Sequence, residues 1–308
     1  MVTHVTIDDR RSGQRLDNFL IATLKGVPRT HIYRIVRRGE VRINHARAKP
    51  DYKLKQGDIV RLPPVRMRPV RAEANEAGHL AWMESRILHE DAALLVLDKP
   101  SGLAVHGGSG IHTSLIEGLR ALRRTQDPFL ELVHRLDRET SGCLLVAKSR
   151  VALGVLHAQL REGRVRKEYL ALVPGSWGGG ARQVDLALQR FGSANGERFV
   201  RTDEGGKPSS TRFTPERHFS DATLVRVRLD TGRTHQARVH ARAIGYPIAG
   251  DAKYGDRSFN ARLKRLGLKR LFLHAARVTF FHPGTAASFT VSAPLPEDLA
   301  QVLEQLRS

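Results

Sequence analysis

The feature that most constrains the fold is a break in composition that begins at Pro63 and Pro64. Residues 65–71 are rich in arginine with little periodicity, and residues 72–78 are small and polar. A tract of about twenty residues without a hydrophobic pattern is longer than the loops that compact domains normally contain. The sequence therefore predicts two domains, residues 1–64 and residues 87–308, joined by a linker at residues 65–86.

The first domain is predicted to hold two helices followed by short strands. Positions 16, 19, 20 and 24 are apolar, and this spacing places them on one face of a helix. Thr30 is predicted as the N-cap of the second helix, and Gly39 as the residue that ends it. Strands are expected at residues 41–44 and 58–62, with a turn at Gly57.

Positive charge is concentrated in this first domain. Residues 1–64 hold 14 Lys and Arg against 6 Asp and Glu. Helical spacing places Arg34, Arg37 and Arg38 on one face of the second helix, close to Tyr33. A basic face on a single helix is often only a solvated surface. In this domain, however, the excess of Lys and Arg is confined to 64 residues, and basic loops follow the helix. These features favour RNA binding over a merely solvated surface.

The second domain is predicted to be richer in strands than in helices. Strands are expected at residues 92–97, 144–147, 167–173, 224–229, 277–281 and 288–291. Helices are expected at residues 111–124 and 151–161, at residues 234–243 with Thr234 as the N-cap, and after Pro296. Strands and helices do not alternate regularly. This order favours an α+β fold with a mostly antiparallel mixed sheet over a doubly wound parallel fold.

Composition narrows the classes of protein and of site. The formal net charge of +20 favours an anionic partner, either nucleic acid or a membrane surface. The single cysteine, Cys143, excludes an intrachain disulfide framework and a cysteine-built metal site. No apolar run is long enough for a membrane span, and the N-terminus lacks a secretory pattern, so we expect a cytoplasmic protein with no membrane partner.

Motifs for bound cofactors are missing from the sequence. Residues 107–110 are rich in glycine but lack the spacing of a dinucleotide site and the lysine of a phosphate-binding loop. The histidines are scattered and form no HExxH pattern. We therefore expect no cofactor and no metal.

The densest polar motif is HRLDRETSG at residues 134–142, which leads directly into an apolar strand. Its Asp137 lies between Arg135 and Arg138, and nearby cations stabilise the ionised form of a carboxyl group. An ionised, fixed aspartate can act as a nucleophile or as an electrostatic stabiliser, but it is a poor general acid. The same pattern is also typical of a loop held together by ion pairs, and spacing alone does not decide between the two.

Several motifs occur in the order found in one enzyme family. They are DKPSG at 98–102, HRLDRETSG at 134–142, KEYLALV at 167–173, LDTGRTHQARVH at 229–240, PIAGDAKYG at 247–255 and LFLHA at 271–275. Together they resemble pseudouridine synthases of the RluA type over residues 87–294, and residues 15–62 are similar to the S4 RNA-binding domain. Ala237 stands where the family usually has a larger aliphatic residue.

The resemblance implies a function and a substrate. It is strongest to bacterial members that convert specific uridines of large-subunit (23S) ribosomal RNA to pseudouridine. The implied enzyme is a cytoplasmic monomer that needs no cofactor and acts on 23S rRNA or on an assembly intermediate of the large subunit.

The resemblance also implies roles for individual residues. Asp137 would act on a flipped-out uridine, by attack at C1′, attack at C6 or elimination to a glycal, and the sequence leaves these routes open. Tyr169 would pack on the uracil, and Arg233 would pair with Asp137. Arg135 would fill the place that the base vacates in the stack, and Leu273 would form an apolar wall.

Two other functions fit parts of the pattern. A non-catalytic RNA-binding or ribosome-associated S4 protein would share the basic surface, but it would have no need of Asp137, Tyr169 and Arg233 together. A glycosidase would need a second catalytic carboxylate and aromatic platforms for sugars. Aromatic residues make up only 6% of the chain, so we rank the glycosidase last.

Overall fold

The computed structural model describes residues 2–24, 27, 29–64, 80–106, 114–192 and 198–306. The chain divides into two compact units, residues 1–76 and residues 77–308. Of the linker predicted at residues 65–86, residues 65–79 lie outside the described residues, and Ala81–Arg86 forms a 3-10 helix, η2. Within the described ranges, no helix is both long enough and apolar enough to cross a membrane.

The first unit packs two helices on a small antiparallel sheet. Its elements are β1 (Thr3–Thr6), η1 (Asp9–Arg11), α1 (Leu16–Thr23), α2 (Arg29–Arg37), β2 (Arg42–Ile43), β3 (Ala46–Arg47) and β4 (Ile59–Leu62). The strand order is β1-β4-β2-β3. Leu16, Phe19 and Leu20 of α1 are buried against Ile32 and Ile35 of α2. The predicted first helix and its apolar face are therefore confirmed.

The second helix begins two residues earlier than the predicted N-cap at Thr30 implies. Because α2 already includes Arg29, Thr30 lies inside the helix, and its assignment as the N-cap is wrong. The predicted end is confirmed. Gly39 has a φ of 74°, and the N–H of Glu40 donates to the carbonyl of Ile35 at 2.9 Å. This bond closes the last turn around a left-handed residue, a conformation that glycine adopts without steric penalty.

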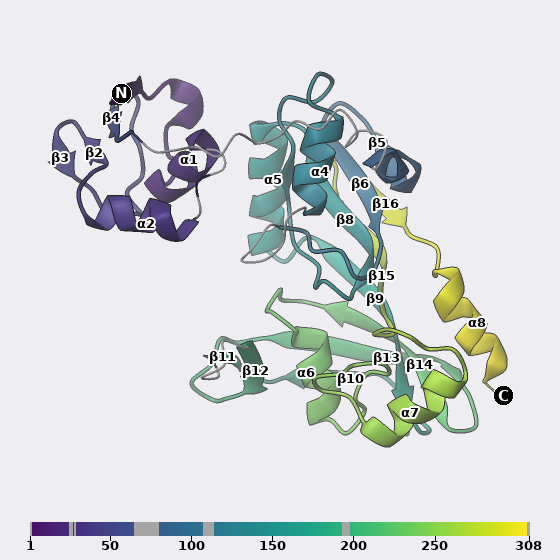
Figure 1. The fold of residues 1–308 in the computed structure, drawn as a ribbon. Coiled ribbons are helices and arrows are strands. Elements are labelled where there is room, and N and C mark those ends of the chain that lie inside the picture. The colour runs from purple at the N-terminus through teal and green to yellow at the C-terminus, as the bar shows by residue number, and fades with distance from the viewer. Residues whose placement is uncertain are drawn as a thin grey trace. The chain divides into compact units, whose positions relative to one another are not determined.

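The second unit is built on a ten-stranded sheet (Figure 1). Its strands are β5 (Ile87–Glu90), β6 (Leu94–Lys99), β7 (Glu131–Leu132), β8 (Ser141–Ala147), β9 (Arg166–Pro174), β10 (Arg182–Asp185), β13 (Ser210–His218), β14 (Ala222–Leu229), β15 (Leu273–Phe281) and β16 (Ser288–Ser292). The main order is β10-β13-β14-β9-β15-β8-β6-β5, with β16 paired to β15 and β7 to β8. Among the described strands only β8 and β15 pair in parallel, so the predicted mostly antiparallel α+β fold is confirmed.

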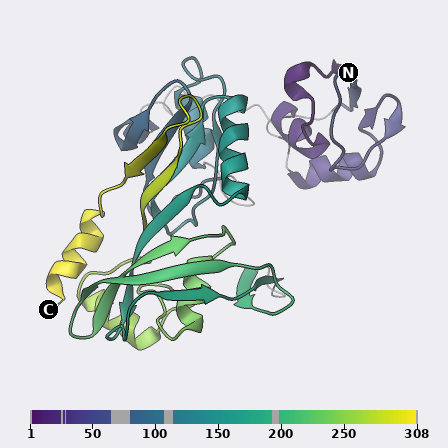
Figure 2. The ribbon, with the colours of Figure 1, turned by 180° about the vertical axis from the view of Figure 1, so that it is seen from behind.

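Helices cover this sheet, and a two-stranded hairpin accompanies it (Figures 1 and 2). The helices are α4 (Leu115–Leu122), α5 (Arg150–Arg161), α6 (Gln236–Ala243), α7 (Arg257–Arg265) and α8 (Glu297–Gln305), and the hairpin joins β11 (Leu188–Gly192) to β12 (Arg198–Thr202). Of the helix predicted at residues 111–124, residues 111–113 lie outside the described part of the chain.

Alternation along β8 creates two apolar cores. Leu144 and Val146 join the cluster that contains α4, whereas Cys143 and Leu145 join the cluster that contains α5. Cys143 is thus a buried residue of β8. Burial raises the pKa of its thiol to about 12, so the sulfur stays protonated at neutral pH.

Candidate active site

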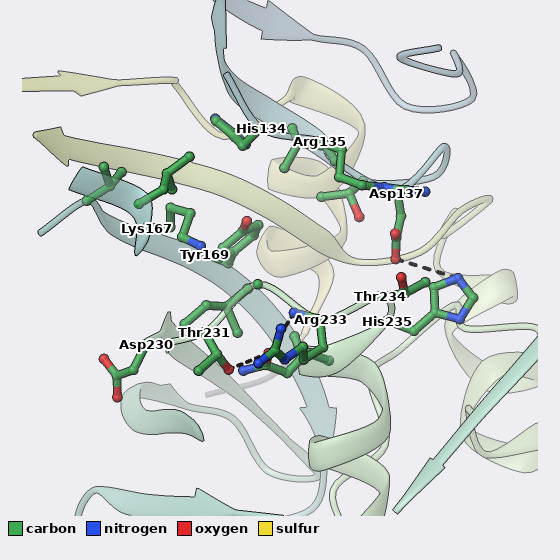
Figure 3. A pocket seen from close by; sticks show the side chains of 18 of the residues that line it. His134, Arg135, Asp137, Lys167, Tyr169, Asp230, Thr231, Arg233, Thr234 and His235 are labelled. Carbon is green, nitrogen blue, oxygen red and sulfur yellow. Dashed lines mark hydrogen bonds and ion pairs between the residues drawn. The ribbon is translucent and has the colours of Figure 1, made fainter. Parts of the chain in front are cut away.

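A pocket of about 310 Å³ opens on the central part of the large sheet (Figure 3). Its lining includes the five residues of the second unit to which the resemblance assigns roles, namely Arg135, Asp137, Tyr169, Arg233 and Leu273. They come from four segments: the loop before β8, strand β9, the turn between β14 and α6, and the start of β15. The sheet brings them together because β9 lies between β14 and β15.

Asp137 is held by a guanidinium that the sequence did not single out. Nη1 of Arg238, in the first turn of α6, donates to Oδ2 of Asp137 at 3.4 Å. Arg238 also makes two hydrogen bonds to Asp251, from Nε at 2.7 Å and from Nη2 at 2.8 Å. Arg238 is 5% exposed and Asp251 is 1% exposed. A permanently charged, buried guanidinium thus donates to Asp137 and orients it.

The pairing of Arg233 with Asp137 that the resemblance implies is absent from the structure. Arg233 is exposed at the pocket, and its Nε donates to the carbonyl of Pro208 at 3.2 Å. The cause is the start of α6. His235 has a φ of 55°, and this left-handed turn places the helix start at Gln236. Arg238, two residues into the helix, is consequently the arginine that reaches Asp137.

Thr234 is not the N-cap of α6, so that prediction is also wrong. His235 occupies the cap position and makes no capping hydrogen bond through its side chain. The buried carboxamide of Gln236 instead stabilises the turn that precedes the helix. Its Oε1 accepts hydrogen bonds from the N–H of Arg233 at 3.0 Å and from the hydroxyl of Thr231 at 2.7 Å. The pocket rim at Arg233 is therefore anchored to the helix.

His235 lies between Asp137 and a buried tyrosine. Its Nε2 is 3.9 Å from Oδ2 of Asp137, and its Nδ1 is 2.9 Å from the hydroxyl of Tyr254. Burial lowers the pKa of His235, and the charge of Arg238 acts in the same direction, while Asp137 opposes both. The imidazole is therefore predominantly neutral at pH 7, and Arg238 is the cation beside Asp137.

The loop that carries Asp137 is fastened to the segment after β6. Lys99 is fully buried, and its Nζ donates to the carbonyls of Pro100, Leu103 and Arg138 at 2.8, 2.9 and 3.1 Å. The hydroxyl of Ser101 donates to the carbonyl of Glu139 at 2.7 Å. Burial lowers the pKa of Lys99 to about 7. The DKPSG motif is thus a clamp on the loop of Asp137.

Gly142 explains why the polar motif ends in glycine. Its φ is 107°, and an added Cβ would lie 2.3 Å from the carbonyl oxygen of Ala275. This is the point where β8 pairs in parallel with β15, with His274 opposite Ser141 and Ala275 opposite Gly142. Any larger residue would push the two strands apart. The close approach fixes the position of the Asp137 loop relative to Leu273.

Tyr169 contributes an almost buried ring to the pocket. It is 6% exposed and belongs to the main core cluster. Burial, reinforced by the charge of Asp137, raises the pKa of its hydroxyl above the usual value near 10. The phenol therefore stays protonated at neutral pH. It can pack on a ligand or donate a hydrogen bond, but it does not offer a standing phenolate base.

Sequence reasoning missed several residues of the pocket region, chiefly Lys167, His235, Arg238 and Asp251. A signal for one pair was present, because Arg238 and Asp251 belong to two of the family-like motifs. Spacing did not reveal that they meet, since their positions are 13 apart and the segment between them includes the end of α6 and a loop. Only the three-dimensional fold places them together.

The arginines singled out in the first unit are exposed, Arg34 and Arg37 on α2 and Arg38 directly after it. Nη2 of Arg34 is 2.9 Å from Nδ1 of His31, and Nε of Arg37 donates to the carbonyl of Tyr33 at 3.3 Å. Arg38 approaches Glu40 at 4.0 Å. These weak local contacts leave the guanidinium groups accessible to phosphates.

Comparisons with known proteins agree with this architecture. A family model described as RNA pseudouridylate synthase matches residues 93–243, and an S4 domain model matches residues 14–60. Proteins named ribosomal large subunit pseudouridine synthase C are similar over nearly the whole chain. That of Haemophilus ducreyi is 53% identical over 100% of this chain and 96% of its own length, and that of Escherichia coli K12 is 53% identical over 100% and 97%.

Solved structures resemble the second unit's fold. Human RNA pseudouridylate synthase domain containing 4 matches with a TM-score of 0.62 and 25% identity, over 76% of this chain and 98% of that one. Human RNA pseudouridylate synthase domain containing 1 matches with a TM-score of 0.55 and 26% identity, over 71% and 92%. These coverages are consistent with a shared catalytic fold.

Proposed function

The chain belongs to the RNA pseudouridylate synthase family, and from that premise we propose that it isomerises specific uridines of large-subunit (23S) ribosomal RNA. Membership makes it an enzyme, a uridine isomerase. The choice of RNA rests on the names of relatives that are about 53% identical over the full chain. The proposed substrate is 23S rRNA or an assembly intermediate of the large subunit.

The observation that supports the chemistry best is the carboxylate of Asp137 in the pocket, paired with buried Arg238. Isomerisation breaks the N1–C1′ bond of uridine, turns the base and joins C5 to C1′. An oriented, ionised carboxylate suits this reaction because positive character develops at C1′ when the glycosidic bond breaks. We assign Asp137 as the catalytic residue that acts on the nucleotide, with Arg238 as its positioning residue.

The other pocket residues are assigned from their chemistry. Tyr169 packs against the uracil, because its ring is buried and its phenol stays protonated. Leu273 supplies an apolar wall. Arg233, exposed at the pocket, contacts the phosphate of the target nucleotide instead of pairing with Asp137.

The target uridine must leave the RNA stack to enter a pocket of about 310 Å³. Arg135 is exposed two residues before Asp137, and its planar guanidinium can stack in the place that the base vacates. Arg34 and Arg37 on α2 and Arg38 directly after it bind phosphates of the same RNA. We propose a monomer with a cytoplasmic site of action, in keeping with the RNA substrate.

Chemical mapping of pseudouridine in rRNA tests this function. A strain that lacks the protein is complemented with the wild type, Asp137→Asn or Asp185→Asn. Asp185 is exposed on β10, so its variant is the matched control for loss of one carboxylate. We expect the wild type and the control to restore pseudouridine, and Asp137→Asn to restore none while binding RNA within a few-fold of the wild type. Restoration by Asp137→Asn would rule out the assignment of Asp137.

A further inference from the structure

Lys167 projects from β9 into the pocket, and the mechanism above gives it no role. Alternate residues of a strand face opposite sides of a sheet. Val165, Lys167 and Tyr169 all line the pocket, whereas Glu168 faces away and pairs with Arg226 at 3.5 Å. The ammonium group of Lys167 therefore shares a face with the ring that we place against the uracil (Figure 3).

Among the residues that the structure describes, the Lys167 ammonium makes no hydrogen bond within 3.5 Å and no ion pair within 4 Å. The side chain is partly buried and reaches the turn at Gly232, where an added Cβ would lie 3.6 Å from Nζ. Burial lowers the pKa of Lys167, and the more distant Asp230 only partly opposes this. A partly desolvated ammonium without an acceptor is costly for the protein, and a bound ligand can supply the acceptor.

The bond cleavage creates an acceptor of the right kind. When the N1–C1′ bond of uridine breaks, its electron pair stays with the base, and the negative charge spreads to the uracil oxygens. The carboxylate of Asp137 stabilises the positive character at C1′. No residue assigned so far stabilises the negative charge on the base. A lysine ammonium has three donors and no acceptor, so it matches a carbonyl oxygen that gains charge.

We propose that Lys167 donates a hydrogen bond from Nζ to a carbonyl oxygen of the flipped-out uracil and stabilises the charge that the base acquires during cleavage. This inference rests on the proposed function. No proton is transferred in the step. The N1–C1′ bond breaks with its electron pair left on the base, C5 of the delocalised anion then bonds to C1′, and the proton lost from C5 is balanced by one gained at N1. Lys167 remains an ammonium throughout. Because the interaction strengthens as charge develops, it acts mainly on the rate.

Single-turnover conversion of an rRNA transcript by excess enzyme tests the proposal. The variants are Lys167→Met and Lys167→Arg, with Lys264→Met on the exposed face of α7 as a control for loss of one lysine charge. We expect Lys167→Met to lower the rate by about 10²–10³-fold, as for loss of one charge-stabilising donor, with the RNA Kd changed only a few-fold. A Lys167→Met rate within two-fold of the wild type would overturn the proposal.

Two further readouts separate this role from a structural one. Lys167→Arg should retain part of the rate, and its activity should persist to higher pH than that of the wild type, since an arginine does not deprotonate. Titration of uracil N3 is common to both enzymes and does not affect the difference. Small alkylammonium ions should also restore the isomerisation rate of Lys167→Ala in proportion to their concentration. This experiment tests the role of Lys167 even if Lys167→Met folds poorly. Absence of rescue, with a folded Lys167→Ala, counts against the proposal.

A failure of the proposed function gives a different pattern. If the wild-type enzyme forms no pseudouridine in any rRNA, the function is wrong, and the inference about Lys167 falls with it. If the wild type is active and Lys167→Met is equally active, only the inference fails.

Discussion

Arg238 joins two carboxylates that have different tasks. One is Asp251, which is buried and also accepts the N–H groups of Lys253 and Tyr254 at 2.9 and 3.0 Å. The other is Asp137, partly open to the pocket. Hydrogen bonds and the charge of Arg238 hold the pKa of Asp251 below its ordinary value, although burial opposes them. The rigid ion pair thus serves as the support on which Asp137 is oriented.

Replacing Arg238 by methionine should reduce both stability and activity. The change leaves buried Asp251 without its counter-ion, and breaking a buried pair in this way typically costs about 3–5 kcal/mol. Urea unfolding measures the loss, and the double variant Arg238→Met with Asp251→Asn is the control. We expect the double variant to recover part of the stability but no activity. Equal stability of the single and double variants would contradict this account.

Asp17 makes the stability of the first unit depend on pH. Arg15 donates to Asp17 at 2.7 and 3.1 Å, and Tyr33 donates at 3.2 Å, so the pKa of this buried carboxyl lies below its ordinary value. A lowered folded-state pKa adds stability above the unfolded pKa of about 3.9, and this stability is lost as the pH falls through the folded pKa.

Asp17→Asn should therefore destabilise the first unit at pH 7, by about 1–3 kcal/mol for loss of hydrogen bonds to a charged group. The deficit relative to the wild type should shrink as the pH is lowered below about 4. Denaturant unfolding followed by NMR signals of α1 measures this. Asp51→Asn, an exposed position in the same unit, should show no deficit at either pH. A deficit that is independent of pH would be inconsistent with the assignment.

At the scale of elements, apolar periodicity predicted the helices and strands that have a clear local pattern. The helices α1, α5 and α8 and the strands β8, β9 and β14 occur where apolar spacing placed them. Short strands without a clear pattern were not predicted, among them β1, β3, β7 and β10. Such strands depend on their partners: Ala46 and Arg47 of β3 are exposed, and they extend only because they pair with β2.

In the candidate site, likewise, local motifs identified residues but not the contacts that the fold creates between them. Motifs identified Asp137, Tyr169 and Leu273, whose side chains do line one pocket. They did not identify which arginine meets Asp137, because that depends on the left-handed backbone of His235. Histidine adopts that conformation more often than most residues do, but still too rarely for a single His235 to predict it from the sequence.

Gly142→Ala should destabilise the second unit by more than about 2 kcal/mol, because the residue has a positive φ and its Cβ would collide with the backbone of Ala275. Gly154→Ala is the matched control, since its Cβ would meet no atom within 4 Å in the exposed face of α5. We expect that variant to gain about 0.5–1 kcal/mol from helix propensity. Urea unfolding followed by fluorescence of Trp82 and Trp177, both in this unit, reports the two changes.

At the scale of the whole molecule, the net charge of +20 is divided between two tasks. The first unit carries exposed arginines on α2, which have only weak local partners. In the second unit, several arginines serve structure. Arg123 is 6% exposed and binds Glu84, Glu90 and Asp127 at 2.6–3.0 Å. Charge alone therefore overstates the number of groups that are available to RNA.

Replacing Arg34, Arg37 and Arg38 together by glutamine should weaken rRNA binding and reduce its dependence on salt. Each lost phosphate contact should lower the slope of log Kobs against log salt by about 0.7–0.9. Binding titrations at several salt concentrations measure the slope. Arg123→Gln is not a suitable control, because Arg123 forms structural ion pairs. Arg257→Gln, exposed at the start of α7, serves instead. An unchanged slope in the triple variant would exclude α2 as an RNA-binding surface.

The parallel pairing of β8 with β15 has a consequence for the order in which the enzyme is made. It joins Ser141 to His274, 133 positions apart, and so is among the contacts of high contact order that form late in folding. During synthesis, the first unit can fold while the partner strand of β8 is still untranslated. The pocket, which includes Leu273 of β15, can therefore be completed only after residue 275 has been synthesised.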